Sequence, residues 1–94
     1  MELAFIINTH TDQTECIRDT IDSISTYATN NILVVVDGLA WNNYKDLQIP
    51  AYKMEGFRHG CRKSPYKNVA LGIKTASENW PDSDWYCYCE YDVL

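Results

Sequence analysis

The chain alternates between continuous apolar runs and stretches in which apolar residues recur every three or four positions. The runs at residues 3–8 and 32–36 predict two strands that are buried on both faces of a sheet. A shorter run at residues 51–55 and an aromatic run from residue 85 predict two more strands. We expect the last strand also to be buried on both faces.

Two segments have the apolar periodicity of a helix. The first begins with Asp12 and Glu15, which form a capping-box signal, and the second begins with Ser64 as N-cap and Pro65 as first helical residue. Residues 41–47 predict a short helix or an ordered loop, which Pro50 ends. The predicted apolar face is Ile17, Ile21, Ile24 and Ala28 in the first helix, and Tyr66, Val69, Ala70, Ile73, Ala76 and Trp80 in the second.

The resulting order β-α-β-β-α-β predicts an α/β fold with a Rossmann-like parallel sheet and right-handed crossovers. A chain of 94 residues has room for one domain, which we place at residues 1–94. In such sheets, ligands bind outside the carboxyl ends of the strands. The fold therefore predicts where a site lies before any motif is considered.

Charge and hydropathy narrow the choice of partners. The net charge of -5 argues against nucleic acid as the main partner. The apolar stretch at residues 3–7 is too short to cross a membrane and has no basic start, so we expect a cytoplasmic protein without a transmembrane segment. We expect the four cysteines to be reduced and to act as small hydrophobes rather than to bind zinc with His10 and His59.

Polar residues follow three of the predicted strands. Asn8, Thr9 and His10 close the first, Asp37 and Gly38 close the second, and Glu90 and Asp92 close the last. Carboxylates at the end of a buried strand need a compensating partner, and a divalent cation is the obvious one. Residues two apart on a strand point to the same face, so Glu90 and Asp92 are able to turn toward one ion.

These elements together resemble the nucleotide-sugar-binding, N-terminal half of a GT-A-type, family-2-like glycosyltransferase. The resemblance implies that Asp37 contacts the base or ribose of the donor, with Asn8, Thr9 and Gly38 beside it. It also implies that Glu90-x-Asp92 takes the place of the D-x-D motif, which holds Mn²⁺ or Mg²⁺ on the donor diphosphate.

Binding an anionic donor also requires local positive charge, and half of the eight basic residues lie at positions 58–67. We assign the phosphates to Arg62, Lys63 and Lys67, near the start of the second helix. Two departures from the family pattern occur: Asp-Asp-Gly-Ser is reduced to Asp37-Gly38-Leu39, and Ala70 stands where the Asn of Ala-Arg-Asn-x-Gly would be. Asn68 is expected on the helix surface.

The resemblance places the general base and the acceptor site beyond the metal motif, so no catalytic residue is assigned and the chain alone is expected to have little or no activity. Simpler roles remain open: a solvated strand end for Glu90 and Asp92, a plain turn for Asp37-Gly38, and an ordinary surface for the basic loop. The alternative function is a non-enzymatic nucleotide-binding or interaction module. Self-association through an exposed edge of the last strand is a further expectation.

Overall fold

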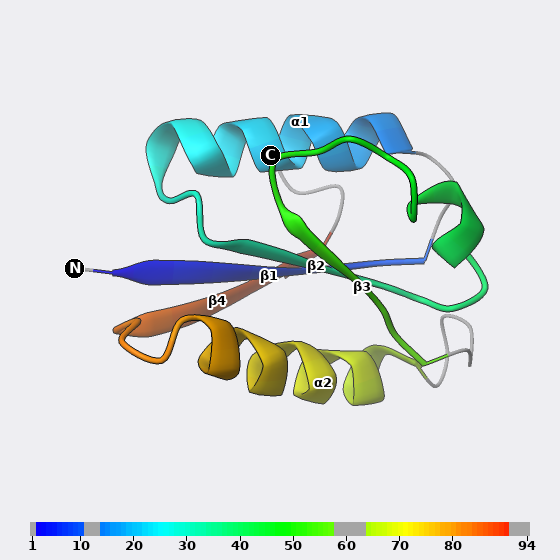
Figure 1. Ribbon diagram of the computed structural model, residues 1–94. Coiled ribbons are helices and arrows are strands. Elements are labelled where there is room, and N and C mark those ends of the chain that lie inside the picture. The colour runs from blue at the N-terminus through cyan, green and yellow to red at the C-terminus, as the bar shows by residue number, and fades with distance from the viewer. Residues whose placement is uncertain (1, 11–13, 58–63, 91–94) are drawn as a thin grey trace.

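The computed structural model describes residues 2–10, 14–57 and 64–90. These residues form a four-stranded, all-parallel sheet with interleaved helices, which confirms the predicted α/β arrangement (Figure 1). The elements, in chain order, are β1 (Leu3–Thr9), α1 (Thr14–Tyr27), β2 (Ile32–Val36), the 3₁₀ helix η1 (Trp41–Asn43), β3 (Tyr52–Glu55), α2 (Ser64–Asn79) and β4 (Trp85–Glu90).

The strand order is β3-β2-β1-β4. The chain moves outward from β1 through β2 to β3, and then returns through α2 to place β4 on the other side of β1. The two crossovers run in opposite directions across the sheet, and crossovers between parallel strands are right-handed. As a result, α1 and α2 lie on opposite faces of the sheet (Figure 1). The order reverses between β1 and β4, and parallel sheets bind ligands at such a switch point.

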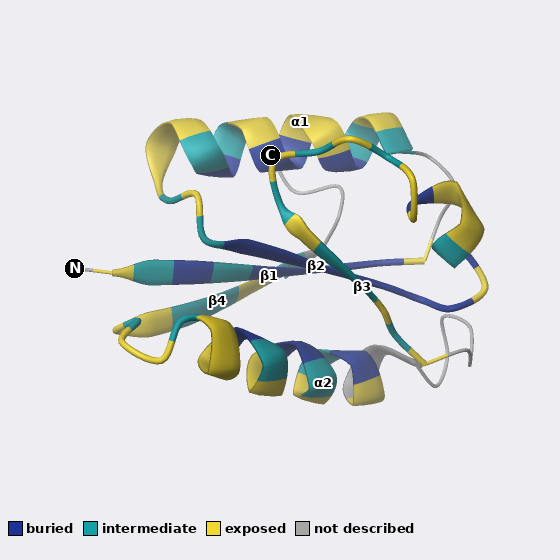
Figure 2. Ribbon diagram, in the orientation of Figure 1, coloured by how far each residue is buried: buried dark blue, intermediate teal, exposed yellow. Residues whose placement is uncertain are grey.

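The larger core cluster lies between the sheet and α1. Ile17, Ile21 and Ile24 are buried as predicted, whereas Ala28 is exposed and follows the end of the helix. The three isoleucines pack with the residues of β1 and β2 that point to the same face, such as Ile7 and Val34. All of β2 is buried, as expected for an inner strand covered on both faces (Figure 2).

The face that α2 presents to the sheet differs from the predicted stripe. Ala76 is buried as predicted, whereas Ala70 and Ile73 are exposed, and Asn68 and Gly72 are buried as well among the helix residues whose burial is described. A Cβ on Gly72 would lie 2.6 Å from Ile6 Cγ2. The helix therefore approaches the sheet closely at Gly72, and the larger apolar residue Ile73 lies outside the contact.

The expectation that β4 is buried on both faces was wrong. β4 is an edge strand that pairs with β1 only, among the strands that the structure describes. Trp85 is 61% exposed, and Tyr88 is exposed as well. The exposed apolar edge that we expected on the last strand is present. In Figure 2, the ribbon of β4 has the colours of intermediate and exposed residues. Within the described residues, no helix is long and apolar enough to cross a membrane.

Candidate functional site at the carboxyl edge of the sheet

Four of the five buried polar residues that the structure describes gather at one end of the sheet. Asn8 and Thr9 are the last two residues of β1, Asp37 follows β2, and Asn68 lies early in α2. The Asp37 N–H donates to the Thr9 carbonyl over 2.9 Å, so the two strand ends lie against each other. The predicted nucleotide-binding residues Asn8, Thr9, Asp37 and Gly38 are thus brought together.

Two of these side chains contain buried polar atoms that lack a hydrogen-bond partner among the described residues. They are both amide atoms of Asn8, Oδ1 and Nδ2, and the carboxylate oxygen Oδ2 of Asp37. Asn8 is 9% exposed and Asp37 is 2% exposed. Each such atom costs about 1–3 kcal/mol of stability. Polar groups that are kept at this cost at the carboxyl edge of a parallel sheet are candidates for contacts with a ligand.

The second oxygen of Asp37 has a structural role. Oδ1 accepts a hydrogen bond from the Leu39 N–H over 2.9 Å, which is the geometry of an Asx turn. Asp37 therefore takes part in a turn, as one interpretation of Asp37-Gly38 predicted, but only its Oδ1 is used there. Because the turn fixes the carboxylate, the orientation of Oδ2 is set before any ligand arrives.

A hydroxyl pair and one lysine support the strand ends from the α1 side. Thr9 Oγ1 and the Tyr44 hydroxyl share a buried hydrogen bond of 2.9 Å. The Lys53 ammonium donates to the Tyr44 carbonyl over 2.8 Å and to the Lys45 carbonyl over 3.1 Å, and it also donates to the Leu47 carbonyl. The Lys53 ammonium thus joins three carbonyls of the loop after η1 and helps to fix Tyr44 beside Thr9.

The side of the edge toward β3 contains an aromatic and a basic residue. The Phe57 carbonyl accepts from the Gly38 N–H over 3.2 Å, and the Phe57 N–H donates to Asn68 Oδ1 over 2.8 Å. The Lys67 ammonium lies 5.6 Å from the centroid of the Phe57 ring. Of the three predicted phosphate-binding residues, Lys67 is placed near Asp37-Gly38 through Phe57, while Arg62 and Lys63 lie outside the described residues.

The predicted metal ligands are only partly covered by the structure. The backbone of Glu90 pairs with Asn8 at the last register position between β4 and β1, so its Cα reaches the same edge. The Glu90 side chain and the whole of Asp92 lie outside the described residues. Within the described part of the chain, no group of three His, Cys, Asp or Glu residues is able to hold a metal ion.

Three residues at this edge were not singled out as site residues from the sequence. Tyr44 and Phe57 lie in segments without a clear pattern, so nothing in the sequence marked them. Asn68, expected on the helix surface, is buried, because it faces Gly56 and the exit of β3. Its spacing of four residues from Gly72 and of eight from Ala76 was the available signal, since residues at that spacing share a helix face. His10 is exposed, and Cys16, Cys87 and Cys89 are half-buried.

Comparisons of the chain with protein-family models, with curated proteins and with solved structures gave no match. The fold and the carboxyl edge are therefore interpreted from their own geometry.

Proposed function

We propose that the carboxyl edge of the sheet binds a nucleoside-diphosphate sugar, as the donor-binding region of a glycosyltransferase. The observation that supports this most strongly is the buried, unpartnered Oδ2 of Asp37 at the end of β2, beside the unpartnered amide of Asn8 on β1. A carboxylate oxygen accepts from ribose hydroxyls or a base N–H, and an amide both donates and accepts. Because these atoms are covered, a ligand that uses them must displace neighbouring side chains.

Glu90 and Asp92 would hold Mn²⁺ or Mg²⁺ on the diphosphate in this proposal. The ion would neutralise the charge that develops on the leaving diphosphate when the glycosidic bond breaks. The backbone position of Glu90 beside Asn8 supports this placement. Lys67, with Arg62 and Lys63, would add positive charge on the other side of the nucleotide. The donor sugar, the acceptor and the general base are not assigned.

Calorimetric titration of the chain with nucleoside diphosphates and their sugars, with and without Mn²⁺, tests the proposal. Asp37→Asn keeps Oδ1 for Leu39 but replaces the charged acceptor, so we expect affinity to fall roughly 10- to 150-fold, the range for a hydrogen bond to a charged group. Asp46→Asn, at an exposed aspartate, is the matched control and should bind like the original chain. Asp92→Ala should abolish the metal-dependent binding of the nucleotide.

A non-enzymatic nucleotide-binding or interaction module is the alternative function, and metal dependence separates the two. Tight binding that needs no metal would favour the module and contradict the glycosyltransferase proposal. A folded sample that binds no nucleotide at all would contradict the nucleotide site in either form. Circular dichroism of each protein establishes that it is folded before its binding is interpreted.

The exposed edge of β4 supports a proposal of self-association. Residues 85–89 contain no charged side chain, whereas the opposite edge strand, β3, is shorter and contains Lys53 and Glu55. Charged and short edge strands resist pairing with another chain, so β4 is the less protected edge. Sedimentation velocity should show a dimer that dissociates on dilution, and Trp85→Lys should shift it to monomer. A monomer at every concentration would contradict this.

A further inference from the structure

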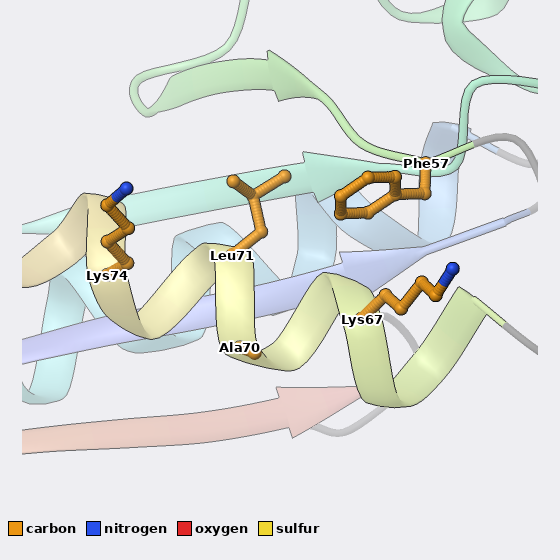
Figure 3. Close-up of a pocket in the computed structure, with 5 residues that line it drawn as sticks. All are labelled: Phe57, Lys67, Ala70, Leu71 and Lys74. Atoms are coloured by element: carbon orange, nitrogen blue, oxygen red, sulfur yellow. The ribbon is translucent and has the colours of Figure 1, made fainter.

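A groove of about 400 Å³ runs along one flank of α2, beside the carboxyl edge (Figure 3). Its volume is at the lower end of the range for small-molecule sites. Phe57, from the segment after β3, and Leu71, from α2, project into the same space, with Lys67 and Lys74 at its two ends. The groove is thus apolar in the middle and cationic at each end.

Phe57 lies outside the helices and strands, yet its backbone is held by hydrogen bonds on both sides. Its N–H donates to the buried Asn68 side chain, and its carbonyl accepts from Gly38. The residue is 44% exposed and belongs to neither core cluster. An exposed aromatic ring on a fixed backbone is a preorganised surface for a planar ligand, since little further ordering is needed on binding.

The backbone of Phe57 is also hydrogen-bonded to the residue that follows the unpartnered carboxylate. Gly38, which donates to the Phe57 carbonyl, directly follows Asp37. A ligand that reaches Asp37 with a hydroxyl or N–H group would therefore lie near the segment that contains the Phe57 ring, over which the Lys67 ammonium lies 5.6 Å from the centroid. In a molecule with a net charge of -5, Lys67 and Lys74 give this groove the local positive charge that an anionic nucleotide requires.

We infer that Phe57 is the stacking platform for the nucleobase of the nucleotide held at Asp37, with Leu71 completing the apolar wall. This inference rests on the proposed function and adds to it the location of the base. Stacking on an aromatic ring is tolerant of base identity, because every base has a π-face. The groove is therefore expected to favour nucleotides over inorganic diphosphate without strong discrimination among bases.

The test compares nucleoside diphosphates with a base-free probe. The 5′-diphosphates of uridine, cytidine, adenosine and guanosine, and inorganic diphosphate, are titrated against the chain and against Phe57→Ala, Phe57→Leu and Phe57→Tyr. We expect Phe57→Ala to weaken the nucleotides roughly 5- to 150-fold and to leave inorganic diphosphate unchanged. Phe57→Leu should lose most of that affinity, and Phe57→Tyr should keep it.

Tyr52→Ala is the matched control, because Tyr52 is a 62% exposed aromatic residue at the other end of the β3 segment. Its ring contacts Trp80, with 5.7 Å between the ring centroids, so it has no place in the proposed site. Proton NMR adds a readout that a merely structural role would not produce. The base protons should shift upfield on binding to the original chain, through the ring current of Phe57, and not on binding to Phe57→Leu.

Each other outcome has a distinct meaning. If Phe57→Ala binds nucleotides normally while Asp37→Asn does not, the stacking inference is wrong and the nucleotide site stands. The same variants are also titrated with nucleoside-diphosphate sugars; if Phe57→Ala weakens only these and not the nucleoside diphosphates, the ring contacts the sugar and the base assignment is wrong. If the folded original chain binds no nucleotide, both the inference and the proposed function fail.

Discussion

Thr9, the last residue of β1, and Tyr44, just after η1, share a hydrogen bond between two buried hydroxyls that are 35 positions apart in the chain. Tyr44 is fully buried in the core cluster on the α1 side. The bond ties the loop after β2 to the end of β1, immediately beside Asn8 and Asp37. The geometry of the candidate site therefore depends on a contact between two segments that are distant in sequence.

Tyr44→Phe should lower the free energy of unfolding by about 1–2 kcal/mol, because it leaves the buried Thr9 hydroxyl without this partner. Urea denaturation measures the change. Tyr27→Phe, at a fully solvated tyrosine, should have no effect. In a cycle with Thr9→Val, the double variant should lose less than the sum of the single losses. Additive losses would show that the bond contributes nothing.

Lys53→Met should lower the free energy of unfolding by about 1.5–3 kcal/mol, since three backbone carbonyls of the loop after η1 lose a charged donor. The apolar stem of the side chain is retained, so the change isolates the ammonium. Lys45→Met removes an exposed lysine of the same loop and should alter stability by less than about 0.5 kcal/mol. Equal effects of the two substitutions in urea denaturation would contradict this role.

Gly72→Ala should destabilise the protein although alanine favours helices by about 1 kcal/mol over glycine. The new methyl would lie 2.6 Å from Ile6 Cγ2 and 3.1 Å from Val35 Cγ2, and both residues are buried in the sheet. Overpacking of this kind costs about 1–3 kcal/mol, which exceeds the gain. In the background Ile6→Ala, the same substitution should become neutral or stabilising. Urea denaturation of the four proteins decides this.

Asn8→Leu should raise the free energy of unfolding by about 1–2 kcal/mol, because it removes two buried polar atoms that have no partner among the described residues and adds apolar surface next to Val35. The same variant should bind nucleoside diphosphates more weakly than the original chain. A gain in stability coupled to a loss of binding is the signature of a group retained for function. A loss of stability would show that the Asn8 amide has a structural role.

Much of the fold was predictable because it follows from local patterns. The apolar run at residues 32–36 coincides with β2. The alternation of strands and helices led to the parallel sheet, whose carboxyl edge then contained Asn8, Thr9, Asp37 and Gly38. The position of the candidate site was thus readable from the order of elements, since parallel strands end at one edge.

The sequence by itself determined which segments become strands and helices and at which edge of the sheet the polar residues meet, because both depend on periodicity and chain order. Only the tertiary structure decided what those residues contact. Gly72 and Ala76, rather than Ile73, face the sheet, because the closeness of helix and sheet is set by the smallest side chains between them, and Asn68 is buried against Gly56. β4 is exposed because the burial of a strand depends on its neighbours in the sheet, and β4 has a described neighbour on one side only. The hydrogen bonds of Phe57 with Asn68 and Gly38 join segments that no local sequence pattern relates.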